Sequence, residues 1–138
     1  MVQRTRTVKE IAGGILIRLL SLLLLFVAVY FTTDIFYNLN ENIFHYVNPP
    51  GFFAMPSWAE DLLALDLALV FWSGIIFGTL GKRMDYILIA AIFLYTLWDY
   101  SGTDNVTQQM YLGLIGITVL GNFIGHLLKL ARQRWLTK

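Results

Sequence analysis

The stretch LLSLLLLFVAVYF, residues 19–31, decides the class of fold. It carries no charged residue and lies inside a longer apolar run from about Ile11 to Tyr37. A helix needs about 20 apolar residues to cross a hydrocarbon core of about 30 Å. The basic flank RTRTVK is typical of a signal peptide, but the run is longer than the apolar segment of such peptides and no small-x-small cleavage site follows. The stretch therefore predicts an uncleaved membrane span.

The rest of the chain has the same apolar character. Of the 138 residues, 57% are hydrophobic and only 14% are charged, whereas soluble proteins carry about 25% charged residues. Further spans are predicted over 62–80, 86–100 and 110–130, with an outer loop over 38–60. The third span reaches full length only if Asp85 and Asp99 sit at its two edges. We expect an all-α membrane protein that folds as one four-transmembrane-helix bundle over residues 1–138.

Charge segregation predicts the direction of these spans. With the N-terminus inside, all ten Lys and Arg residues fall on the inner half, as the positive-inside rule requires. Most acids fall on the outer half: Asp34, Glu41, Glu60, Asp61, Asp66, Asp99 and Asp104. We therefore expect a multi-pass protein of the cell membrane, the bacterial inner membrane, with both termini cytoplasmic. The inner-face anchors in or beside the spans are Arg18, Lys82, Arg83, Lys129, Arg132 and Arg134.

Glycine spacing predicts which helices pack closely. Gly74 and Gly78 lie four residues apart in the second span, and Gly121 and Gly125 do so in the fourth. Small residues at this spacing let two helix backbones approach each other in lipid. These glycines therefore favour contact between the second and fourth helices, although a homo-oligomer or another subunit could use the same faces.

A carboxylate interrupts the second span in ALDLALVFWSG, residues 64–74. An ionised side chain costs about 2.5–3.5 kcal/mol at the centre of a membrane helix, and such residues usually face a partner inside the bundle. No basic residue of the outer half can pair with Asp66. We expect a polar site of Asp66, Asp99 and Asp34, in which converging carboxylates would let one of them carry a proton. A carboxyl that is only hydrogen-bonded near the interface is the alternative, and the sequence leaves both open.

Several function classes find no support in the sequence. The chain has no cysteine, which excludes dithiol chemistry and cysteine-ligated metal. No metal-binding, phosphate-binding or nucleophile motif is present, so we predict no catalytic residue and no metal site. The basic tail KLARQRWLTK directly follows a span and carries Trp135, which suits lipid headgroups; we expect no nucleic-acid partner.

The order of features resembles the DoxX-like family of small four-span bacterial membrane proteins. The resemblance rests on LIRLL (16–20), FFAMPSW (52–58), the acid Asp66, the exit IIFGTLGKR (75–83) and the connection WDYSGTDNVTQQMYLGLIG (98–116). The family usually has Glu where this chain has Asp66. The resemblance implies a four-helix bundle and, for some members, an association with quinone-linked oxidoreductases.

Three functions follow as hypotheses. Our first is a small subunit that assembles or stabilises a larger membrane complex, respiratory or otherwise electron-transferring, with no catalytic activity of its own. The second is a DoxX-like, quinone-associated oxidoreductase component in which the outer carboxylates transfer protons. The third is a small transporter or channel that oligomerises through its glycine faces. The expected partners are the lipid bilayer and other membrane subunits or further copies of the chain; no cofactor is predicted, and a quinone belongs to the second hypothesis alone.

Overall fold

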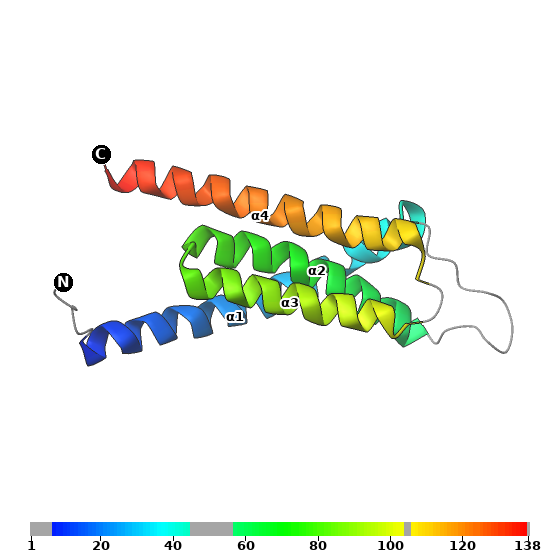
Figure 1. The fold of residues 1–138 in the computed structure, drawn as a ribbon, viewed down its shortest axis with the longest axis horizontal. Coiled ribbons are helices and arrows are strands. Elements are labelled where there is room, and N and C mark those ends of the chain that lie inside the picture. Colours follow the sequence, from blue (N-terminus) through cyan, green and yellow to red (C-terminus); the bar gives the residue numbers. More distant parts are fainter. Residues whose placement is uncertain (1–6, 45–56, 104–105, 138) are drawn as a thin grey trace, which may run out of the picture.

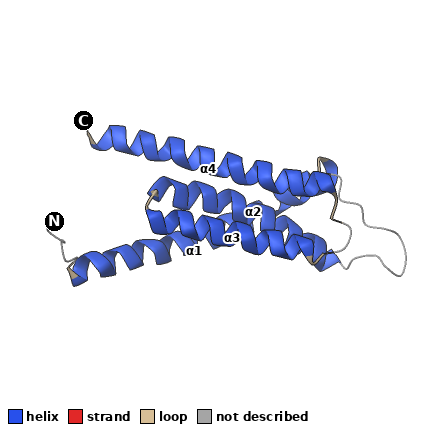
Figure 2. Cartoon of the chain, in the orientation of Figure 1, coloured by secondary structure: helices blue, strands red, loops and turns tan. Residues whose placement is uncertain are grey.

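The computed structural model describes residues 7–44, 57–103 and 106–137, and these ranges contain four helices and no strand (Figure 2). The helices are α1 (Val8–Asn42), α2 (Ser57–Leu80), α3 (Arg83–Ser101) and α4 (Gln108–Leu136). The all-α prediction is confirmed. Each helix is longer than its predicted span, and most of the predicted outer loop (residues 45–56) lies outside the described residues.

Short polar motifs set where the helices begin and end. The backbone N–H of Thr7 donates to Glu10 before α1 (3.2 Å), and the hydroxyl of Thr107 accepts from the N–H of Met110 in α4 (3.3 Å). These contacts satisfy N–H groups that a helix start leaves unpaired. At the end of α2, Gly81 adopts φ 62°, a left-handed conformation that glycine accepts without a Cβ clash. The chain therefore turns from α2 into α3 within two residues.

The helices are arranged around α2 (Figure 1). α2 packs against α1, α3 and α4, whereas α3 and α4 make only slight contact with each other. α2 and α3 form an antiparallel hairpin; α4 runs along one side of it, and α1 passes behind it in this view and ends beside the start of α4. The start of α1 and the end of α4 lie at the same end as the α2–α3 turn, which we call the turn end; the opposite end is the loop end. The bundle is therefore centred on one helix and is not a symmetric ring of four.

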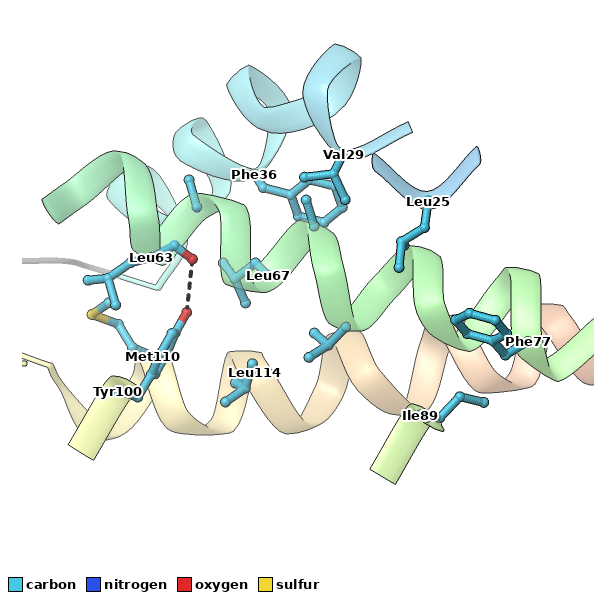
Figure 3. Packing of buried hydrophobic residues seen from close by; sticks show 13 residues of the cluster. Leu25, Val29, Phe36, Leu63, Leu67, Phe77, Ile89, Tyr100, Met110 and Leu114 are labelled. Carbon is cyan, nitrogen blue, oxygen red and sulfur yellow. Dashed lines mark hydrogen bonds between the residues drawn. The ribbon is translucent and has the colours of Figure 1, made fainter. Parts of the chain in front are cut away.

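The buried core follows the inward face of α2 along most of its length (Figure 3). Leu63, Leu67 and Phe77 of α2 are almost fully buried, and they pack with apolar side chains from each of the other helices. Many large apolar side chains of α1 and α4 remain exposed. In the most apolar 18-residue windows, 6% of α1, 22% of α4 and 56% of α2 is buried within the chain. Such exposed apolar faces are what a lipid environment requires.

Three of the described helices are long and apolar enough to cross a membrane: α1, the segment Leu62–Leu80 of α2, and α4. The fourth predicted span, α3, is not among these three helices and stays a prediction. This helix has 19 residues, or about 28 Å at 1.5 Å per residue, and it carries Asp85 and Asp99 within its ends.

The predicted glycines lie where α2 crosses α4. A Cβ added at Gly74 would stand 2.7 Å from the backbone nitrogen of Asn122, and one at Gly78 would stand 3.3 Å from the Cα of Gly125. Added methyl groups at Gly121 and Gly125 would meet the backbone carbonyls of Phe71 and Gly74. The two backbones therefore approach too closely for any side chain, and this contact fixes α4 against the central helix.

Candidate functional site

Asp66 lies on the buried face of α2, near the loop end. Its neighbours on this face, at the spacing of one helical turn, are Leu63 and Val70, both 1% exposed. Asp66 itself is 4% exposed. The carboxyl group is thus inside the bundle and not at its lipid-facing surface.

The partner of Asp66 comes from the neighbouring helix of the hairpin. The carboxyl group of Asp99 in α3 lies within hydrogen-bonding reach of the Asp66 carboxyl. A carboxylate only accepts hydrogen bonds, whereas a protonated carboxyl can donate one. A hydrogen bond between these two groups therefore requires a proton on one of them. We call Asp66 and Asp99 the acid pair.

Tyr100, also on α3, lies beside the acid pair. Its side chain is fully buried, and its phenol lies within electrostatic range of both carboxyl groups. The Tyr100 hydroxyl donates to the backbone carbonyl of Leu63 at 3.4 Å, the contact drawn as a dashed line in Figure 3. The ring of Tyr111 from α4 stands edge-on to the Tyr100 ring, with centroids 5.9 Å apart. Three helices thus contribute to the walls of the site.

Two buried acceptor atoms at this end of the bundle have no hydrogen-bond donor among the described residues. They are Oδ2 of Asp66 and Oδ1 of Asn40, a residue of α1 that is 3% exposed. Buried polar atoms are nearly always paired with protein or ordered water. Oδ2 of Asp66 can therefore carry the proton of the acid pair or accept a hydrogen bond from a water molecule.

No basic side chain of the described ranges stands at the loop end. The Lys and Arg residues of those ranges belong to the first half of α1, the α2–α3 turn and the last turns of α4, all at the turn end. Arg18 pairs with a different acid: its Nε donates to Oδ1 of Asp85 at 3.1 Å. The acid pair is thus left without a counter-ion from the described part of the chain.

The structure separates the three acids that the sequence groups together. Asp66 and Asp99 meet, whereas Asp34 lies on an exposed face of α1. Sequence reasoning missed Tyr100 and Asn40. The buried residues of α3, Asp85, Ile89, Thr96 and Tyr100, share one face of the helix, but the sequence carries no stripe that marks this face.

The predicted inner-face anchors divide into two kinds. Arg18 and Lys129 make contacts inside the protein, since Lys129 donates from Nζ to the Gly81 carbonyl at 3.2 Å and lies 5.8 Å from the centre of the Tyr86 ring. The side chains of Lys82, Arg83, Arg132 and Arg134 are exposed. Arg18, one of the predicted inner-face anchors, is thus half of an ion pair.

A separate apolar hollow of about 460 Å³ lies between the end of α1 and α4. Ile43 and Phe44 form one wall, and Gln109, Leu112 and Gly116 belong to the other. Among the described residues, no group of His, Cys, Asp or Glu could hold a metal ion.

Comparison with known proteins adds no relative to this description. No protein-family model matches the chain, and no curated protein or solved structure matches it. Its function must be inferred from the residues and their arrangement.

Proposed function

We propose that the chain is a multi-pass protein of the cell membrane, with four spans and both termini on the cytoplasmic side, and that its acid pair handles a proton for a larger membrane complex. The fourth span is α3, because it lies antiparallel to α2 as the other half of a tight hairpin and is about 28 Å long. The basic turn end would face the cytoplasm by the positive-inside rule.

The observation that carries this function is the meeting of Asp66 and Asp99 inside the bundle, with no basic partner among the described residues. Two carboxylates at hydrogen-bonding distance repel each other, so one proton shared between them is the stable arrangement. Ionisable groups buried in membrane helices generally mark ion or proton pathways. The buried Tyr100 hydroxyl lies beside the pair and donates to the Leu63 carbonyl.

The partner in this proposal is another membrane subunit. The chain carries no catalytic constellation of its own in the described residues, and the broad exposed faces of α1 and α4 can pack against other helices as well as lipid. We infer that a respiratory or other electron-transferring complex is the class of partner, since such complexes consume or release protons.

Infrared spectroscopy tests the proton directly. A carboxylic acid in the acid pair should give a carbonyl band that shifts in D₂O, disappears in Asp66→Asn and moves in frequency in Asp99→Asn, where Asp66 stays buried but loses its carboxyl partner. Asp34→Asn is the matched control, because Asp34 is an exposed acid of α1, and this change should leave the band intact. A band that survives both acid-pair substitutions would overturn the proposal.

Co-purification tests the complex. A tagged copy extracted gently from its native membrane should bring the same membrane proteins in repeated preparations. A monodisperse particle that contains this chain alone would contradict membership of a larger complex, but it would not contradict a proton held by the acid pair.

A quinone-associated role is the second candidate, and the apolar hollow between α1 and α4 favours it. Its volume of about 460 Å³ and its apolar lining with one amide, Gln109, suit a quinone ring with an isoprenoid tail. Solvent extraction of the purified protein should then yield quinone, and Gly116→Phe, which fills the hollow, should reduce the amount. Protein without quinone would eliminate this candidate.

A further inference from the structure

The turn end contains a recess with a distinct charge. α1 and α4 both extend beyond the α2–α3 turn, so the turn is set back between two longer helices (Figure 1). A hollow of about 210 Å³ lies there, with Arg18, Lys82, Asp85 and Arg132 as its charged lining. The three cations come from α1, the turn and α4, respectively, and they face a single carboxylate.

Asp85 holds one of these cations in a fixed orientation. Its Oδ1 accepts from the Nε of Arg18 at 3.1 Å, and its Oδ2 accepts from the backbone N–H of Lys82 at 2.9 Å. The side chain of Asp85 is 1% exposed, whereas that of Arg18 is 29% exposed. A guanidinium has five N–H donors. The bond to Asp85 and a longer contact from Nη1 to the Gly14 carbonyl (3.5 Å) leave Nη2 without an acceptor among the described residues.

The free donors suit a phosphate group. An arginine fork pairs with phosphate oxygens, and lysine adds a point charge. Since Asp85 neutralises one cation of the three, the recess retains two uncompensated positive charges, which attract an anion. Lys82 and Arg132 are exposed, so an anion can approach them without the removal of an existing ion pair.

The recess also has an apolar side. Ile17 of α1 and Leu80 of α2 line it together with the charged groups. A ligand with a phosphate and an attached hydrocarbon chain matches this combination, whereas a free ion would use only the charged part. Basic hollows between membrane helices on the cytoplasmic side are a known kind of site for anionic lipid headgroups.

We propose that the turn-end recess binds the phosphate of an anionic phospholipid, with Arg18 held ready by Asp85 and with Lys82 and Arg132 as the other two donors. This differs from the general attraction of basic loops to a negative membrane surface. General attraction depends on the number of charges, whereas a site depends on which charges line it.

The chain supplies matched pairs of residues for the test. Lys82 and Arg132 line the recess; Arg83 and Arg134, close to them in sequence and also exposed, do not. Native mass spectrometry of the full chain in detergent, titrated with phosphatidylglycerol, should show weaker lipid binding for Lys82→Gln and for Arg132→Gln. About fivefold weaker binding per removed charge is expected. Arg83→Gln and Arg134→Gln should change it by less than about twofold, as for a charge outside the site.

The same titration with other ligands distinguishes the source of the phosphate. Phosphatidylcholine should bind weakly to every variant, and inorganic phosphate should not displace phosphatidylglycerol. Equal losses in all four variants would overturn the proposal in favour of general attraction. Displacement by inorganic phosphate, with no preference between the two lipids, would overturn the lipid assignment. Circular dichroism of each variant checks that the helices are retained, and a variant that loses them is replaced by its Lys82→Ala or Arg132→Ala equivalent.

Discussion

Arg18 in α1 and Asp85 in α3 form an ion pair of 3.1 Å, which joins two helices that otherwise meet mainly through α2. The carboxylate is buried and the guanidinium is partly open to the recess. This pair therefore ties the first helix to the hairpin at the turn end and, in the proposal above, also orients a ligand donor.

Breaking this pair should destabilise the bundle. In Arg18→Gln, Asp85 would remain buried without its cation, and removal of one partner of a buried pair costs about 3–5 kcal/mol. Because Arg18 is partly exposed, we expect the unfolding free energy to fall by about 3 kcal/mol, the lower end of this range. Denaturant titration in detergent micelles, followed by circular dichroism, measures it.

A double substitution is the control for that measurement. Arg18→Gln with Asp85→Asn removes both charges, so most of the loss should be recovered. If the double variant is as unstable as the sum of the two single variants, the ion pair contributes nothing and the effect lies in packing.

The α2–α4 crossing should not tolerate side chains at its glycines. In Gly74→Ala the new methyl group would stand 2.7 Å from the backbone of Asn122, so the two helices must separate. Overpacking of this kind costs about 1–3 kcal/mol. Thermal unfolding in detergent should show a lower midpoint for Gly74→Ala and also for Gly125→Ala.

Gly116 is the matched control on α4, since a Cβ there meets nothing within 4 Å. Gly116→Ala should leave the midpoint unchanged or raise it, because alanine is the better helix former by about 1 kcal/mol. Equal losses at Gly116 and Gly74 would contradict a close backbone contact at the crossing.

Asp66 should be dispensable for stability although it matters for function. In Asp66→Asn the amide can donate to Asp99 without any added proton, and functional groups commonly cost stability. We expect the unfolding free energy to stay within about 1 kcal/mol of the original value or to rise. A loss of more than about 2 kcal/mol would show that the carboxyl is structural and would favour the alternative of a merely hydrogen-bonded acid.

The hydrogen bond from Nε1 of Trp72 to the hydroxyl of Thr32, 2.9 Å long, links α2 to α1. Trp72→Phe removes the donor and keeps an aromatic ring. Hydrogen bonds between membrane helices are worth about 0.6 kcal/mol on average, so a small loss is expected. Thr32→Val should lower the unfolding free energy by a similar amount. Because both substitutions remove the same hydrogen bond, the double variant should lose less than the sum of the two single losses. Fully additive losses would show that this bond contributes nothing to stability.

Sequence alone predicts much of the fold because lipid imposes a simple rule. Long apolar runs such as residues 19–31 must be helical, since every backbone polar group needs an internal partner in hydrocarbon. The spacing of Gly74 and Gly78, and of Gly121 and Gly125, indicates a close crossing for the same reason. The number of spans is less secure: α3 is short and has acids at both ends, so composition alone does not decide its place.

The site is only partly predictable, because sequence does not give the rotation of one helix against another. α3 has apolar residues all round, so no stripe marks its inward face. Asp99 could be named as a neighbour of Asp66 by depth, but Tyr100, one residue further, could not. Likewise, Arg18 and Asp85 are 67 residues apart in sequence, and their pairing depends on how far α1 extends past the hairpin.

The central position of α2 bears on the order in which the protein is made. Of the four helices, α1 is synthesised before the others; only 6% of its apolar window is buried within the chain, so it can enter the bilayer alone. α2 follows and carries Asp66; in the folded chain, 56% of its apolar window is buried. Asp99 and Tyr100, which complete its polar site, are synthesised only with the following helix. If α2 and α3 insert together as one hairpin, Asp66 enters the hydrocarbon with Asp99 already beside it. The two-residue turn at Gly81 would then serve membrane insertion as well as the final fold.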